Sequence, residues 1–110
     1  MGVGYLKDVV YRDTLDDLIV AFCRDYSSRK GAISSGKCKR RTRMEYEYIN
    51  ARISEAAREI VGEEFEKYIN EIGFSVGYAN SEVYGISEKS YKENKKEVKV
   101  NIARKLHLLD

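Results

Sequence analysis

Apolar residues recur at helical spacing along most of the chain. The first such group is Leu15, Leu18, Ile19, Phe22, Cys23 and Tyr26. Steps of three and four residues place these side chains on one face of a helix, and Thr14 with Asp17 has the form of a capping box. We predict a first helix over residues 14–30 and a break over residues 31–36. Residues 1–12 are expected to form an arm, with a short ordered piece around 6–11.

A second apolar stripe predicts a long helix over residues 43–61. Its members are Met44, Tyr48, Ile49, Ile53, Ala56, Ile60 and Val61. Gly62 interrupts the stripe, and the two glutamates that follow suit a new helix start. A helical period then runs to Val83, so a helix is favoured over 63–83, although Gly73 and Gly77 cost about 1 kcal/mol each in a helix interior. The alternative for part of this segment is a short strand over 74–78.

The last element begins at a glycine turn. Gly85 can adopt a positive φ, and Ser87 can cap a helix that follows it. The apolar face of that helix comprises Tyr91, Val98, Ile102, Leu106 and Leu109. The pattern therefore predicts an all-α fold, a compact bundle of four or five helices forming one domain of 110 residues. The expected core comprises Phe22, Ile53, Ile60, Phe65, Ile69, Ile102 and Leu106.

Charge is distributed unevenly along the chain. The net charge is only +2, yet residues 29–43 carry seven bases and no acid, and residues 44–88 carry three bases and ten acids. Residues 89–110 are basic again, with seven bases and three acids. Two interpretations stay open. The basic blocks form an electrostatic footprint for a polyanion, or they are neutralised by acidic blocks within the fold.

The segment 84–97 resembles the turn and recognition helix of helix-turn-helix proteins. More narrowly, it resembles the C-terminal part of sigma-factor region 4 and of the ArpU-like late-gene regulators of phages. The core of the resemblance is Gly85, Ile86, Ser87, Ser90 and Tyr91, with basic residues and a closing apolar helix behind it. Asn80 and Ser81 depart from the pattern in the preceding helix, and Asn94 departs from it in the recognition helix.

The resemblance implies double-stranded DNA as partner, in transcriptional control in a phage or prophage setting. The residues expected near bases or phosphates are Ser87, Glu88, Lys89, Ser90, Lys92, Glu93, Lys95, Lys96 and Lys99. The alternative is an ordinary loop and cap that lead into a surface helix.

A second candidate DNA contact is the dense basic run between the first two predicted helices. Its residues are Lys37, Lys39, Arg40, Arg41 and Arg43. Phosphate contact depends on charge and needs little geometry, which suits such a run at a loop-to-helix junction. The alternative is a solvated basic face that balances nearby glutamates. The nine tyrosines are expected to be mostly half-buried core residues, with base stacking as the alternative.

The sequence contains few residue patterns that would support a catalytic or metal-binding function. His107 is the sole histidine, and Cys23 and Cys38 form no Cys-x-x-Cys pair. We therefore expect no enzyme activity, no metal, no cofactor and no small-molecule substrate. The chain has neither a membrane-length apolar run nor a signal-peptide core, so no membrane partner and a cytoplasmic location with reduced thiols are expected.

Two functions from different classes remain. One is a sequence-specific DNA-binding transcriptional regulator, which could also form a homodimer. The other is a helical interaction or homo-oligomerising module without DNA binding, in which the helix over 43–61 docks a partner. Exposed apolar side chains along that helix favour the module. Lysines of the last helix that share one face with the 37–43 run favour DNA.

Overall fold

The computed structural model describes residues 11–109, and over these residues the protein is all α-helical. The described elements are α2 (Asp13–Arg24), α3 (Tyr26–Ser35), α4 (Arg40–Val61), the 3-10 helix η1 (Gly62–Glu64), α5 (Phe65–Gly73), the 3-10 helix η2 (Tyr78–Asn80) and α6 (Glu88–Lys105). The all-α prediction is confirmed. Most of the expected arm lies outside the described residues; Tyr11 and Arg12 precede α2 without helical structure.

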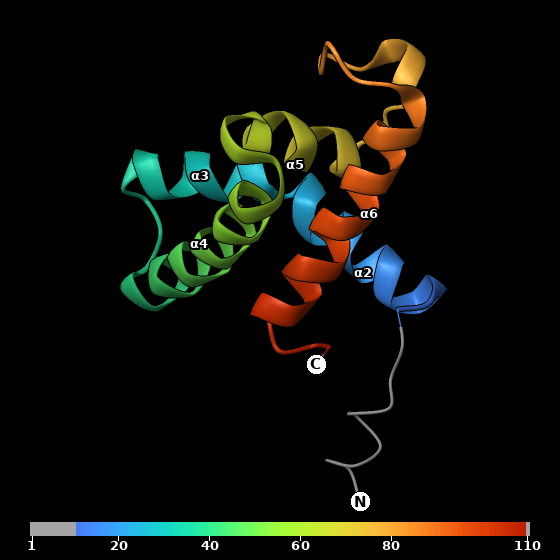
Figure 1. Cartoon of the computed structure of the whole chain (residues 1–110). Helices are drawn as coiled ribbons and strands as arrows, with labels where there is room; N and C mark the ends of the chain where they lie inside the picture. Colours follow the sequence, from blue (N-terminus) through green and yellow to red (C-terminus); the bar gives the residue numbers. More distant parts are fainter. Residues whose placement is uncertain (1–10, 110) are drawn as a thin grey trace, which may run out of the picture.

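The helices pack around a shared hydrophobic core (Figure 1). α4 packs on α6 and on α3, while α2 passes behind α6. α5 contacts both α2 and α4. The side chains that meet at the centre are buried almost completely: Ile19, Cys23, Ile53, Ile69, Ile72, Val98 and Ile102. Burying a side chain of this size stabilises the fold by about 1.5–3 kcal/mol.

The single helix predicted over 14–30 is wrong, because the chain turns at Asp25 and forms α2 and α3 instead. Ile19, Cys23 and Tyr26 are all buried, and they are spaced by four and three residues across the turn. Because this spacing is helical, the apolar pattern does not reveal the turn at Asp25. The predicted capping box is also wrong. α2 begins at Asp13, and its N-cap residue Arg12 makes no side-chain cap bond. Gly31 lies inside α3, which ends at a left-handed Gly36.

A buried arginine stabilises the turn between α2 and α3. Arg29 donates from Nε to Asn50 Oδ1 at 2.6 Å and from Nη2 to the Phe22 carbonyl. Asn50 in turn donates to the Tyr26 carbonyl at 3.1 Å. The Phe22 carbonyl lies in the last turn of α2, where helical partners run out, and Arg29 supplies its donor. Arg29 and Asn50 therefore fasten α3 to α4.

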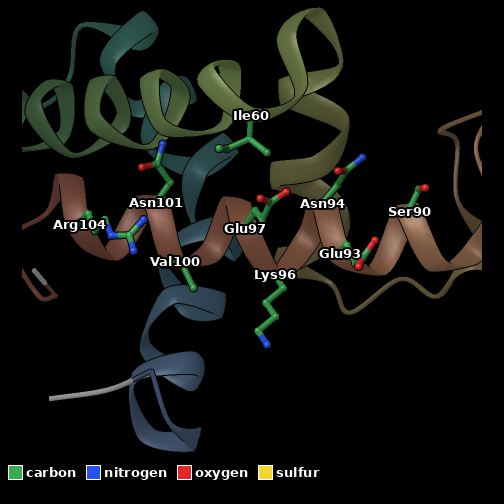
Figure 2. Close-up of a pocket in the computed structure, with 9 residues that line it drawn as sticks. All are labelled: Ile60, Ser90, Glu93, Asn94, Lys96, Glu97, Val100, Asn101 and Arg104. Atoms are coloured by element: carbon green, nitrogen blue, oxygen red, sulfur yellow. The ribbon is translucent and has the colours of Figure 1, made fainter.

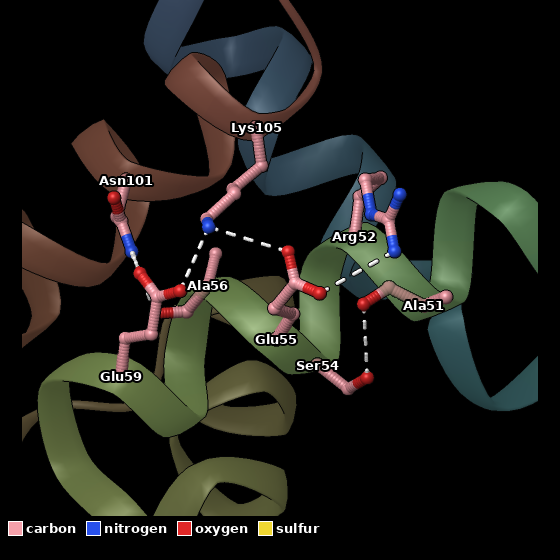
Figure 3. A network of polar contacts seen from close by, with 8 residues as sticks. All are labelled: Ala51, Arg52, Ser54, Glu55, Ala56, Glu59, Asn101 and Lys105. Atoms are coloured by element: carbon pink, nitrogen blue, oxygen red, sulfur yellow. Dashed lines mark hydrogen bonds and ion pairs between the residues drawn. The ribbon is translucent and has the colours of Figure 1, made fainter.

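Polar side chains join α4 to α6 along their outer edge (Figure 3). Lys105 lies between Glu59, at 2.7 Å, and Glu55, at 3.2 Å. Asn101 donates to the Ala56 carbonyl and to Glu59, both at 3.0 Å. These pairs are partly exposed and contribute modestly to stability, but they fix the register of α6 on α4.

The predicted helix over 63–83 ends at Gly73, and residues 74–84 form neither that helix nor the alternative strand. Ser75 has φ +55, and the amides of Ser75 and Val76 bond back to the carbonyls of Ile72 and Glu71. This is the Schellman pattern that terminates helices. The chain then reaches α6 through residues 74–87, not through the short turn that the sequence indicated.

The core prediction is confirmed for Ile53, Ile69 and Ile102, which are buried. Phe22, Phe65 and Leu106 are partly buried against the core. Ile60 was expected inside but is 36% exposed. It lies near the end of α4, above an open groove along α6, where no other element of residues 11–109 covers it (Figure 2).

Candidate nucleic-acid interface

The basic run at 37–43 lies where α4 begins. Lys39 is the N-cap residue of α4, and Arg40, Arg41 and Arg43 occupy its first turns. All five basic side chains of the run are exposed, and the Arg41 side chain is 93% accessible. Cys38 and Thr42 are only partly exposed. The fold therefore presents the predicted cluster to solvent as one group, which we call the α4 basic cluster (Lys37, Lys39, Arg40, Arg41 and Arg43).

Neighbouring acids neutralise little of this cluster. Among the described residues, its carboxylate contact is between Arg41 and Glu45, at 3.6 Å within one helix. Glu66 pairs with Lys30 at 2.7 Å, and Glu64 pairs with Lys67 at 3.2 Å. Glu64 and Glu66, two of the acids expected to balance the cluster, thus contact other bases, while Glu45 contacts Arg41 of the cluster itself. This favours the polyanion interpretation over internal neutralisation.

The cluster also opposes the dipole of α4. The positive end of a helix dipole lies at its N-terminus, where cations cost stability and anions gain it. The first turn of α4 holds no acid. Arg40, Arg41 and Arg43 therefore raise the electrostatic energy of the free protein, and a bound anion would lower it.

The second predicted surface begins at Ser87. The Ser87 hydroxyl accepts the Ser90 amide at 3.1 Å, so the predicted cap is confirmed, as is a positive φ of 83° at Gly85. Lys89, Lys92, Glu93 and Lys96 are exposed along the first half of α6. Lys92 pairs with Glu88 at 2.9 Å. Lys89 and Lys96 have no ion-pair partner among residues 11–109.

Two lysines in the predicted set have structural contacts instead. Lys95 donates to the Val76 carbonyl at 2.7 Å, and Lys99 pairs with Asp16 of α2 at 2.8 Å. Both are only partly exposed, because they lie on the side of α6 that faces the bundle. Of the lysines expected near bases or phosphates, Lys95 and Lys99 are therefore held by contacts within the protein. Lys89, Lys92 and Lys96 remain as the exposed bases of this surface, which we call the α6 lysine face.

A buried carboxylate holds the connection to α6 in place. Glu71 is 3% exposed. It accepts hydrogen bonds from the Ser81 hydroxyl at 2.6 Å, the Glu82 amide at 2.7 Å and the Tyr91 hydroxyl at 2.6 Å. Lys95 donates to the Val76 carbonyl at 2.7 Å, and the Tyr91 hydroxyl, whose one proton is given to Glu71, lies 3.1 Å from the same carbonyl oxygen. We call this set of contacts the Glu71 clamp.

The clamp shifts the pKa values of its members. Burial alone would raise the pKa of Glu71, but the hydrogen bonds it accepts and the Lys95 charge lower it overall. Burial, with donation to Glu71, raises the pKa of Tyr91 to about 12. Burial lowers the pKa of Lys95. Glu71 is thus ionised and Tyr91 protonated at neutral pH, the states that their hydrogen bond requires.

The departures from the helix-turn-helix pattern have a place in this arrangement. Ser81 bonds to Glu71, and Asn94 donates to the Tyr68 hydroxyl at 3.1 Å. Polar contacts thus stand at Ser81, where the preceding helix of the pattern would pack a small apolar residue, and at Asn94, where the recognition helix would bury an apolar one. Sequence reasoning missed Glu71, although an acid on the otherwise apolar face of Tyr68 and Ile72 was a visible signal.

The two basic surfaces lie at opposite ends of the molecule. α4 begins at one side of the bundle in Figure 1, and α6 begins at the other. A groove of about 620 Å³ runs along α6 beside the C-terminal end of α4, lined by Ile60, Ser90, Glu93, Asn94, Lys96, Glu97, Val100, Asn101 and Arg104 (Figure 2). The arrangement that would favour DNA binding, with lysines of the last helix on one face with the 37–43 run, is therefore not the one that the fold adopts.

Apolar side chains are also exposed on α4. Met44 is 58% and Tyr48 is 48% exposed, one turn apart on the same helix face. Arg52, one turn further, lies over the Tyr48 ring at 5.3 Å. This short apolar stretch continues directly from the α4 basic cluster.

Other site types are not visible in the part of the chain that the structure describes. No group of three or more metal-binding side chains comes together in residues 11–109. None of the described helices has the length and apolar character needed to cross a membrane. Cys23 is buried, which raises its thiol pKa to about 12, and His107 follows α6 in a left-handed conformation.

Comparisons with protein-family models, curated proteins and solved structures find no match for this chain. Its function is therefore inferred from its own residues.

Proposed function

We propose that this protein binds double-stranded DNA. The observation that carries the proposal is the α4 basic cluster, which is exposed, largely unneutralised and opposed to the dipole of its own helix. Other bases of the chain, such as Lys30, Lys99 and Lys105, contact carboxylates within the fold. The α4 basic cluster raises the electrostatic energy of the free protein, and binding to an anionic partner would lower that energy. A phosphate backbone offers a row of such anions.

The α6 lysine face supplies the second contact. Lys89 and Lys92 lie in the first turns after the Ser87 cap, where a helix placed in the major groove would meet base edges. Because the two surfaces lie far apart, one protein would contact the duplex at two separated places. The α4 basic cluster would hold the backbone, and α6 would supply sequence preference. Control of transcription, in a phage or prophage setting, is what the sequence resemblance adds to this proposal.

A comparison of two variants of equal charge tests the proposal. Lys39→Gln with Arg43→Gln removes two charges from the α4 basic cluster. Lys30→Gln with Lys105→Gln removes two charges that carboxylates already neutralise. The first variant should bind a labelled random duplex roughly tenfold or more weakly at moderate salt, while the second should bind like the wild type. Equal losses would mean that only net charge matters, and absence of binding by the wild type would refute the proposal.

The exposed Met44 and Tyr48 favour a second candidate, a homo-oligomerising or protein-interaction module that docks through α4. A Met44→Lys variant separates the candidates. If α4 mediates self-association, sedimentation velocity should show an oligomer that this change disrupts. If α4 serves DNA, Met44→Lys should leave the sedimentation of the protein unchanged, and the added charge should not weaken DNA binding.

A further inference from the structure

The first turns of α4 are exposed to solvent on most of their surface. Among residues 40–48, Thr42 and Tyr46 are partly covered and the others are exposed. Tyr46 lies beside Ser28 and Ala32, so the covered side is the one that faces α3. Figure 1 shows the start of α4 at the edge of the bundle, away from α2 and α6. A helix about 10–12 Å across, with its first turns free in this way, fits into the major groove of a duplex, which is about 12 Å wide.

The turn before α4 is short and begins with a glycine. α3 ends at Ser35, and residues 36–39 lead directly to Arg40, the first residue of α4. Gly36 has a left-handed φ of 70°, which lets the chain leave α3 and turn toward α4. In DNA-binding proteins, two helices joined by such a turn present the N-terminal residues of the second helix to base edges. The α3–α4 pair therefore gives α4 a route to the bases that is independent of α6.

One row of side chains on this helix end changes from basic to apolar. Arg40, Met44 and Tyr48 are four residues apart, which places them one above the other on α4. Met44 is 58% exposed, although it directly follows the α4 basic cluster. Exposure of a methionine to water costs free energy that contact with another apolar group recovers. On the base edges of a major groove, that apolar group is the C5 methyl of thymine.

Charge at this end of α4 favours a duplex around that row. Residues 37–48 hold five bases, which form the α4 basic cluster, and two acids, Glu45 and Glu47, so their net charge is +3. Glu45 contacts Arg41 at 3.6 Å, and the other four bases of the cluster have no carboxylate contact among the described residues. A glutamate at base edges accepts a hydrogen bond from cytosine N4, so Glu47 is compatible with a groove. Phosphates beside the groove would thus meet bases, while Met44 lies between them.

We propose that the first turns of α4 enter the major groove and that Met44 contacts a thymine methyl group there. The inference rests on the proposed DNA binding and names the base group that the α4 end of the molecule recognises. The α4 basic cluster keeps its role at the phosphates, and α6 contributes its own base contacts at the other end. The α4 end therefore prefers duplexes with A·T base pairs at the position of Met44.

Removal of the methyl group from thymine tests this contact. A labelled A·T-rich duplex is compared with the same duplex in which uracil replaces every thymine, a change that removes the C5 methyl and keeps the base pairing. The wild type should bind the uracil duplex about fourfold more weakly, the effect of one lost methyl contact. Met44→Ala should bind the thymine duplex more weakly than the wild type and should bind both duplexes equally.

Further variants control for side effects of the change at Met44. Met44→Leu retains an apolar side chain and should keep the preference for thymine. Leu18→Ala, which truncates an exposed apolar side chain of α2, should keep it too. Met44→Lys should lose the preference, although its added charge maintains affinity for random duplex DNA.

The outcomes separate this inference from the proposed DNA binding. If the wild type binds both duplexes equally, or if Met44→Ala keeps the full preference of the wild type, the methyl contact is overturned. DNA binding then stands when Lys39→Gln with Arg43→Gln weakens binding to both duplexes. If Met44→Ala instead converts an oligomer of the free protein into a monomer, Met44 meets a second copy, and the inference is also overturned. If the wild type binds neither duplex, both proposals fall together.

Discussion

The hydroxyl of Tyr91 donates a buried hydrogen bond of 2.6 Å to the carboxylate of Glu71, twenty positions earlier in the chain. This bond joins α6 to the end of α5. Its carboxylate also holds the Ser81 hydroxyl and the Glu82 amide, which lie in the connection between the two helices. One acid thus orders a segment that contains little regular secondary structure, and this ordering fixes where α6 begins.

Removal of the charge at Glu71 should therefore destabilise the protein. Glu71→Gln leaves at least one of its three donors poorly paired, and Tyr91→Phe removes one donor while keeping the ring. Each should lower the free energy of unfolding by about 1–3 kcal/mol, measured from urea unfolding curves. Glu63→Gln changes an exposed acid and should stay within about 0.5 kcal/mol of the wild type. Unchanged urea midpoints for both clamp variants would show that the clamp does not stabilise the fold.

The clamp should also make stability depend on pH. The pKa of Glu71 in the folded protein lies below its ordinary value of 4.5. The folded state therefore favours the charged form, and this contribution is complete above pH 4.5 and lost as the pH falls through the folded pKa. The stability difference between wild type and Glu71→Gln should be constant near neutral pH and shrink in acid. A difference that grows as the pH falls below 4.5 would contradict the lowered pKa.

Gly73 should not tolerate the substitution that usually stabilises a helix. A Cβ at Gly73 would lie 2.6 Å from Arg24 Cα, so α2 and α5 would have to separate. Gly73→Ala should cost about 1–3 kcal/mol despite the better helix propensity of alanine. Gly31 lies inside α3 with nothing within 4 Å of its added Cβ. Gly31→Ala should therefore stabilise by about 0.5–1 kcal/mol, and thermal unfolding of the two variants should shift in opposite directions.

The two basic surfaces should affect DNA binding differently. Arg40→Ala or Arg41→Ala should weaken binding to all duplex sequences about equally, because phosphate contacts carry no sequence information. Lys89→Ala or Lys92→Ala should reduce discrimination between a selected site and random DNA by about 1–3 kcal/mol. A site selected from a random duplex library provides the measurement. If all four variants weakened binding to the selected site and to random DNA equally, the proposal that α6 contacts bases would be contradicted.

The elements that periodicity predicts well are those whose apolar face meets the core over several turns. α4 and α6 are such helices, with Ile53 and Ile102 buried as expected. Periodicity failed where a side chain far away in the chain decides the backbone. The turn at Asp25 depends on Arg29 and Asn50, and the early end of α5 on contacts that Glu71 makes with residues beyond it. The apolar spacing around Val76 predicts a helix because it depends only on neighbouring positions and not on polar contacts with distant ones.

For the candidate site, the sequence predicted which side chains are exposed, but it did not predict the contacts that some of them make within the fold. Exposure of Lys89, Lys92 and the α4 basic cluster follows from charged residues opposite an apolar stripe, which sequence displays directly. The contacts of Lys95 with Val76 and of Lys99 with Asp16 could not be foreseen. They depend on how α6 crosses the connection and α2, a relationship between segments that helical spacing does not specify.

Salt dependence of binding to random duplex DNA tests the central claim most directly. Each phosphate contact adds about 0.9 to the slope of log affinity against log salt. The wild type should bind tightly at low salt with a steep slope, and Lys39→Gln with Arg43→Gln should reduce that slope by up to about 1.8 if both residues contact phosphates. Lys30→Gln with Lys105→Gln should leave the slope unchanged. No detectable duplex binding by the wild type at low salt, or identical slopes for all three proteins, would contradict the account.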